Sequence, residues 1–189
     1  SGTTVSYPSA AFSRDGKGVY LTTDRENEFT RLAYMDLASR RIRTLTQAIP
    51  WDIDEFALSD DGTLLAFVAN ENGFGRLHLM ATATGRERTL GSAPRGLVSG
   101  LVWRHGSNEL GFTLSSARAP ADAWSLDVAT GRFTRWTESE TGGIDFSAVP
   151  DPELIQWKGS DGLALSGFLY RPAARFAGPR PVVVSIHGG

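Results

Sequence analysis

The chain has 189 residues, of which 41% are hydrophobic and 21% charged, a balance typical of globular proteins and not of disordered ones. Its 19 basic and 21 acidic residues are mixed along the sequence and give a formal net charge of −2, so no surface for nucleic acid is expected. No apolar run is long enough for a membrane span, and the absence of cysteine excludes disulfides, thiolate metal sites and cysteine nucleophiles.

Three similar stretches follow one another over the first 140 residues. Each begins with an apolar residue and a short polar turn with glycine, and continues into a strand-like segment: FSRDGKGVYLTTD, LSDDGTLLAFVAN and WRHGSNELGFTLS. The second half of each unit repeats too, as RLAYMDLASRRIRTLT, RLHLMATATGRERTLG and DAWSLDVATGRFTRWT. The corresponding residues Ala38, Ala83 and Ala129 are 45 and 46 positions apart, so we count three copies.

Each copy is interpreted as four short antiparallel strands. Asp15-Gly16 and Asp61-Gly62 suit tight turns between the first two strands, because glycine accepts the positive φ that such turns require. Thr84-Gly85 and Thr130-Gly131 do the same between the last two strands. The first copy has Ser39-Arg40 there, so we expect that turn to be looser or differently shaped. Four antiparallel strands every roughly 40 to 50 residues are typical of β-propeller blades.

The repeated pattern, S-x-D-G before one strand and T-G before another, resembles the blades of TolB-like propellers, which include the N-terminal domains of the prolyl oligopeptidase family. We assign blades to residues 5–47, 51–91 and 98–138, within a propeller part at 1–140. Aromatic side chains bury large areas, so the tryptophans are interpreted as core and inter-blade packing and not as ligand-stacking groups. They are Trp51, Trp103, Trp124, Trp136 and Trp157.

The composition changes after the third copy. Residues 141–152 are rich in Gly, Ser, Asp and Pro and are predicted to form a linker. Residues 153–172 predict a strand, a Ser-Asp-Gly turn and a second strand, and the run VVVSI at 182–186 predicts a strand buried on both faces. This order, ending in His-Gly-Gly, resembles the start of the α/β-hydrolase domain in the prolyl oligopeptidase family (S9), nearest to acylaminoacyl-peptidases and dipeptidyl-peptidases.

The predicted fold class is therefore mostly β. It consists of a partial β-propeller of about three four-stranded blades, followed at 153–189 by the first strands of an incomplete α/β-hydrolase domain. In such hydrolases the loop after the third strand supplies a backbone N–H to the oxyanion hole. The resemblance implies that Gly189 is this donor and that His187 and Gly188 shape the loop. It also places all three members of the Ser-His-Asp triad after Gly189, so we expect this chain by itself to be inactive.

Other residues with reactive side chains are interpreted as structural. Ser185 and His187 lie on one face of the predicted strand, but the sequence has no G-x-S-x-G motif, so Ser185 is expected to be a buried or half-buried structural serine. His78 and His105 are expected to be satisfied or solvated. The acidic clusters lack a calcium-loop spacing, so their carboxylates are expected to be solvated and no metal site is predicted. These carboxylates are Asp52, Asp54, Glu55, Asp60 and Asp61.

The sequence thus predicts part of a serine peptidase that cleaves short peptides, with a propeller that limits substrate size and no cofactor. An esterase of the same architecture is an alternative within enzymes. A non-catalytic TolB-like propeller that binds protein partners is the alternative outside them. Expected partners are short peptides, the remaining blades and hydrolase domain, and further copies of the chain through its open blade faces. The compartment stays open, with the cytoplasm favoured over the periplasm.

Overall fold

Strands joined by turns and loops make up most of the described part of this computed structural model. The structure describes residues 4–88, 90, 93–146, 149–172, 176 and 178–186. Over those residues it forms the strands β1 to β14 in four antiparallel sheets, without an α-helix. No helix that could cross a membrane occurs in this described part of the chain.

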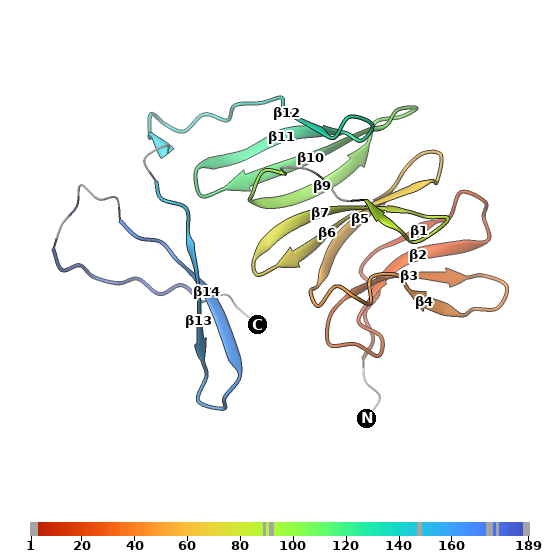
Figure 1. Cartoon of the computed structure of the whole chain (residues 1–189), viewed down its shortest axis with the longest axis horizontal. Helices are drawn as coiled ribbons and strands as arrows, with labels where there is room; N and C mark the ends of the chain where they lie inside the picture. Colours follow the sequence, from red (N-terminus) through yellow and green to blue (C-terminus); the bar gives the residue numbers. More distant parts are fainter. Residues whose placement is uncertain are drawn as a thin grey trace.

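Three of the sheets have four strands each, and in each sheet the strands follow one another in chain order. The first sheet contains β1 (Ala10–Phe12), β2 (Gly18–Thr23), β3 (Arg31–Asp36) and β4 (Ile42–Thr44). The second contains β5 (Ile53–Leu58), β6 (Leu64–Glu71), β7 (Phe74–Ala81) and β8 (Glu87–Arg88). The third contains β9 (Leu97–Trp103), β10 (Glu109–Ser116), β11 (Ala119–Asp127) and β12 (Arg132–Arg135). Figure 1 shows them stacked one after another, which confirms a partial propeller of three blades.

The turn between β3 and β4 corrects one expectation. Arg40 has a φ of 57°, close to the 67° of Gly85 and the 75° of Gly131 in the other two blades. Its N–H donates to the Asp36 carbonyl oxygen at 2.8 Å, just as the Gly131 N–H donates to the Asp127 carbonyl oxygen at 2.7 Å. The turn is therefore the same in all three blades. The Asp36 carboxylate stabilises it in the first blade by accepting bonds from the Ser39 N–H and hydroxyl, both at 2.7 Å.

The core lies between the blades, and strand β6 contributes to it from both of its faces. Leu65 and Phe67 belong to the cluster between the first and second blades, whereas Ala66 and Val68 belong to the cluster between the second and third. All four are fully buried, as the two-residue period of a strand between two neighbours requires. The second blade is thus the centre of the described propeller.

The tryptophans follow the packing interpretation only in part. Trp103 is buried at the second interface, where its indole N–H donates to the Ala57 carbonyl oxygen of the neighbouring blade at 3.1 Å. Trp136 and Trp157 remain 65% and 48% exposed, so they are not core residues among the described elements. The Trp136 indole N–H is held by the Ser125 hydroxyl at 2.8 Å, on the open face of the third blade.

A fourth sheet follows the propeller. It is the hairpin of β13 (Glu153–Lys158) and β14 (Ala164–Leu169), drawn in blue in Figure 1. Its Phe168 ring meets the Phe74 ring of the second blade edge to face, with centroids 5.0 Å apart. Arg118 of the third blade also pairs with Asp151, just before β13, at 3.1 Å. The hairpin therefore contacts the propeller at the ends of the second and third blades.

The segment 182–186 corrects a second expectation. These residues form no strand, and the Val183 side chain is 90% exposed. A strand buried on both faces needs neighbouring strands that take up its N–H and C=O groups. None of the fourteen described strands pairs with this segment, so the VVVSI pattern alone does not produce the predicted strand. Ser185 is likewise exposed, not buried or half-buried.

A buried carboxylate closes the third blade. Asp122 of β11 is 2% exposed and accepts hydrogen bonds from Arg135 at 2.6 Å, the Thr137 hydroxyl at 2.9 Å and the Ser139 N–H at 2.8 Å. Burial by itself raises the pKa of Asp122, but the bonds from Thr137, Arg135 and Ser139 outweigh it and lower the pKa from 3.8 to about 2. The carboxylate thereby fixes the chain that leaves the propeller to β11.

This lowered pKa predicts an acid-sensitive contribution to stability. Because the folded pKa lies below the unfolded one, the contribution is present above about pH 4 and is lost as the pH falls through about 2. Asp122→Asn is expected to lower the melting temperature at pH 7 by about 5 °C or more and to remove this part of the acid dependence. Thermal unfolding of the unchanged chain and of the Asp122→Asn variant between pH 2 and 7 measures this loss of stability. Parallel pH curves for the two proteins would contradict this assignment.

Candidate functional site

The residues predicted to form the oxyanion loop, His187, Gly188 and Gly189, lie outside the described residues. The candidate site in the described part of the chain is instead a pair of adjoining cavities where the second blade, the third blade and the hairpin β13–β14 meet. Both cavities were missed by the sequence interpretation, because their walls come from positions far apart in the sequence.

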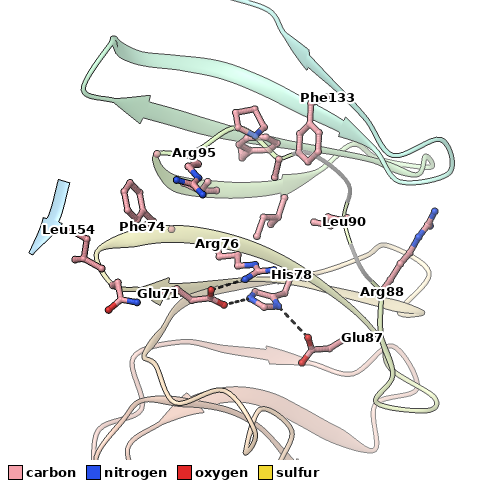
Figure 2. Close-up of a pocket in the computed structure, with 18 residues that line it drawn as sticks. Glu71, Phe74, Arg76, His78, Glu87, Arg88, Leu90, Arg95, Phe133 and Leu154 are labelled. Atoms are coloured by element: carbon pink, nitrogen blue, oxygen red, sulfur yellow. Dashed lines mark hydrogen bonds and ion pairs between the residues drawn. The ribbon is translucent and has the colours of Figure 1, made fainter. Parts of the chain in front are cut away.

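The first cavity has a volume of about 650 Å³ and lies between the second and third blades. Figure 2 shows the polar side of this cavity on β7 and β8, with Phe133 and Arg95 on the opposite side. Leu90, Phe112 and Phe133 form an apolar wall, and Leu154 of the hairpin contributes at one end. A cavity of this size, partly apolar and partly charged, is typical of a small-molecule site.

An ionic cluster forms the floor of the first cavity. Glu71 pairs with Arg76 at 2.9 Å and with the His78 Nε2 atom at 3.3 Å, and Glu87 meets the His78 Nδ1 atom at 3.3 Å. The His78 ring also stacks on Phe67, with centroids 4.8 Å apart and the planes 5° from parallel. Both ring nitrogens therefore have carboxylate partners, which confirms that His78 is a satisfied residue.

The second cavity has a volume of about 350 Å³ and lies against the hairpin. Phe168, Tyr170 and Pro152 line it from the hairpin side, and Ser115 and Leu97 line it from the third blade. It shares three lining residues with the first cavity, so the two cavities adjoin at this point. The shared residues are Phe74, Arg95 and Gly96.

Two of the acidic residues, Glu55 in β5 and Asp60 after it, are less solvated than expected. Glu55 is half-buried, and its Oε2 atom accepts the Gly100 N–H of the third blade at 3.1 Å. Burial raises the pKa of Glu55, and bonds from the Leu101 and Gly100 N–H groups partly offset this rise. Asp60 accepts the Gly106 N–H at 2.9 Å, which is the main reason why its pKa is lowered. Both carboxylates thus connect two blades, which corrects their assignment as solvated turn residues.

His105 contacts a carboxylate, and no metal site is found among the described residues. The His105 Nδ1 atom pairs with Asp60 at 2.6 Å while the ring stays exposed, so His105 is both partnered and solvated. Within the described ranges, no group of three or more His, Asp or Glu side chains is arranged to hold a metal ion. Among the described residues, the two histidines with side-chain contacts, His78 and His105, are bonded to carboxylates and not to a serine or threonine hydroxyl.

Comparison with solved structures identifies the fold. A puromycin-hydrolyzing peptidase from Mycobacterium tuberculosis matches with a TM-score of 0.77 and 18% identity, over 95% of this chain and 28% of its own. A puromycin hydrolase matches with a TM-score of 0.76 and 20% identity, over 94% and 27%. Prolyl oligopeptidase B from Galerina marginata matches with a TM-score of 0.73 and 17% identity, over 89% and 24%. No family model and no curated protein matches the chain.

These likenesses, all at or below 20% identity, show the fold and not the activity. The chain spans about a quarter of the length of the structures that it matches. Because β12 ends at Arg135, a match over 95% of 189 residues must also include part of the segment that follows the propeller. The shared architecture therefore extends beyond the third blade.

Proposed function

We propose that the chain is part of a serine peptidase of the prolyl oligopeptidase family (S9) that cleaves short peptides, of the acylaminoacyl- or dipeptidyl-peptidase type. The observation that supports this most strongly is the match to peptidase structures beyond the third blade, over 94–95% of the chain. A shared propeller alone would not favour an enzyme, because propellers also serve as binding modules. The hairpin and the His-Gly-Gly sequence after it favour an enzyme over a binding module.

The proposed organisation assigns each part of the chain a role. Blades at 1–140 restrict access to the active site, 141–152 is the linker, and 153–189 begins the α/β-hydrolase domain. In the whole enzyme a Ser-His-Asp triad would transfer the acyl group of the substrate to water. Gly189 would donate its N–H to the oxyanion, and His187 and Gly188 would shape the loop that presents it.

The open faces of the outer blades support the proposal that further blades complete the ring. Phe12 on the first blade is 71% exposed, and Val102 on the third is 62% exposed. Trp103 of the third blade occupies the position that Phe12 has in the first blade, and it is buried against the second blade. Apolar area of this kind favours association, so further copies of the chain are the alternative partner when the remaining blades are absent.

An esterase of the same architecture remains the closest alternative, because the same triad can hydrolyse an ester bond as well as a peptide bond. A non-catalytic propeller is the more distant alternative. The contact of Phe168 with Phe74 speaks against it, because a binding module has no need for a hairpin packed on its blades.

The test uses a serine-directed fluorophosphonate together with chromogenic acyl-peptide and ester substrates. The 189-residue chain is expected to remain unlabelled and inactive, since no triad is proposed for it. The longer polypeptide that contains it should be labelled and should hydrolyse acyl-peptides. Labelling of the 189-residue chain would refute the assignment, as would a folded longer protein that is not labelled. Hydrolysis of esters but not of peptides would select the esterase.

A further inference from the structure

The charges that line the two cavities are not all paired. Three carboxylates line them, and each has a partner: Glu71 pairs with Arg76, Asp151 pairs with Arg118, and Glu87 contacts the His78 ring. Arg88 and Arg95 line the first cavity without an ion-pair partner in the part of the chain that the structure describes. The unpaired charge at this site is therefore positive, and an anion is the complementary ligand.

Of these two arginines, only Arg95 also lines the second cavity. It lines both cavities, at the point where they join, and Figure 2 shows its side chain next to Phe74. Arg88 lies near the other end of the first cavity, beyond Leu90. A group bound at Arg95 can therefore extend into either cavity.

The backbone beside Arg95 is held in place from two sides. The Gly96 carbonyl oxygen accepts the Gly75 N–H at 3.0 Å, which joins it to the second blade. On the other side, Gly96 lies so close to the third blade that a Cβ atom there would collide with the Ser115 carbonyl oxygen. Glycine is required here by this close approach. The backbone from which the Arg95 side chain extends is therefore held close to both blades.

Arg95 is exposed, and apolar and aromatic groups line the two cavities that meet beside it. Phe74 and Phe168 lie where the second blade meets the hairpin, and Phe112 and Phe133 form the wall of the first cavity. A ligand that fits these walls has an apolar body next to its anionic group. A guanidinium binds a carboxylate through two parallel hydrogen bonds, which favours a planar anion of that kind.

We propose that Arg95 binds the C-terminal carboxylate of a short peptide whose last side chain is apolar or aromatic and packs in the adjoining cavities. The choice of a peptide, and not another apolar carboxylate, rests on the proposed function. The cavities lie where the propeller meets the hairpin, so a peptide held here is held at the boundary of the two parts. Arg95 would select free C-termini and thus short substrates or products.

The test measures binding to the 189-residue chain by calorimetry. The ligands are N-acetyl-Ala-Ala-Phe with a free carboxylate and the same peptide as its amide. The acid is expected to bind at least about tenfold more tightly than the amide, because the amide cannot accept both guanidinium bonds. Arg95→Gln should weaken binding of the acid about tenfold and remove its advantage, while Arg95→Lys should retain part of it.

Arg41→Gln is the matched control, since Arg41 is exposed and lines neither cavity. It should bind the acid as the unchanged chain does, and circular dichroism should show all variants folded. Equal binding of acid and amide, no effect of Arg95→Gln, or no binding of either peptide would overturn the proposal. Phenylpropionate serves as the non-peptide carboxylate, and tighter binding of it than of the peptide acid would reject the peptide.

This result is independent of the labelling experiment described above. Labelling of the longer enzyme without carboxylate-dependent binding would leave the peptidase assignment standing and reject the role of Arg95. Carboxylate-dependent binding without labelling or hydrolysis would support the role of Arg95 and reject the peptidase assignment. Arg95 would then belong to a binding propeller.

Discussion

Replacing Phe67 with alanine is expected to lower the free energy of unfolding by about 3–5 kcal/mol. Phe67 is fully buried in β6, the strand that packs on both neighbouring blades, and its ring stacks on His78. The substitution would leave a cavity in the middle of the described propeller, and it would also remove the surface that holds the imidazole between Glu71 and Glu87. Urea denaturation followed by tryptophan fluorescence measures the effect.

Phe12→Ala provides the matched control for this experiment, because the same atoms are removed from a side chain that is 71% exposed. Its effect on the 189-residue chain should stay within about 0.5 kcal/mol. Equal destabilisation by the two substitutions would mean that the second blade is not the centre of the core. A dilute sample is needed, since the open blade faces favour association.

Gly189→Pro in the longer enzyme is expected to lower kcat about 10²-fold to 10³-fold, or roughly 3 kcal/mol, under the proposed function. Proline has no N–H, so this change removes the proposed oxyanion donor and leaves the triad intact. Gly188→Ala should have a smaller effect, through the shape of the loop if glycine is needed there for a positive φ. Steady-state kinetics with an acyl-peptide substrate measures both.

Proline also restricts φ, so the comparison requires two controls. The melting temperature of the Gly189→Pro enzyme and its rate of labelling by the fluorophosphonate should both stay near those of the unchanged enzyme. If such a well-folded variant kept its kcat, the oxyanion hole would have to be formed elsewhere. His-Gly-Gly would then have no part in binding the oxyanion.

Local patterns were enough to predict the three blades. The Asp-Gly pairs and the alternation of apolar residues act within about ten residues, and hairpins depend mainly on such short-range preferences. Their limit is visible at Arg40, which adopts the same turn as Gly85 without being glycine. There the Asp36 carboxylate stabilises a positive φ that a rule based on glycine alone does not include.

The sequence by itself therefore determined the number of blades, their strand order and the change of pattern after the third blade, because each depends on neighbours along the chain. Only the tertiary structure decided which charged residues have partners. Glu55 bonds to Gly100 across 45 positions, and Arg95 lines two cavities whose walls come from two blades and a hairpin. The exposure of residues 182–186 was likewise decided by the tertiary structure, since burial of a strand requires neighbouring strands that its own residues do not specify.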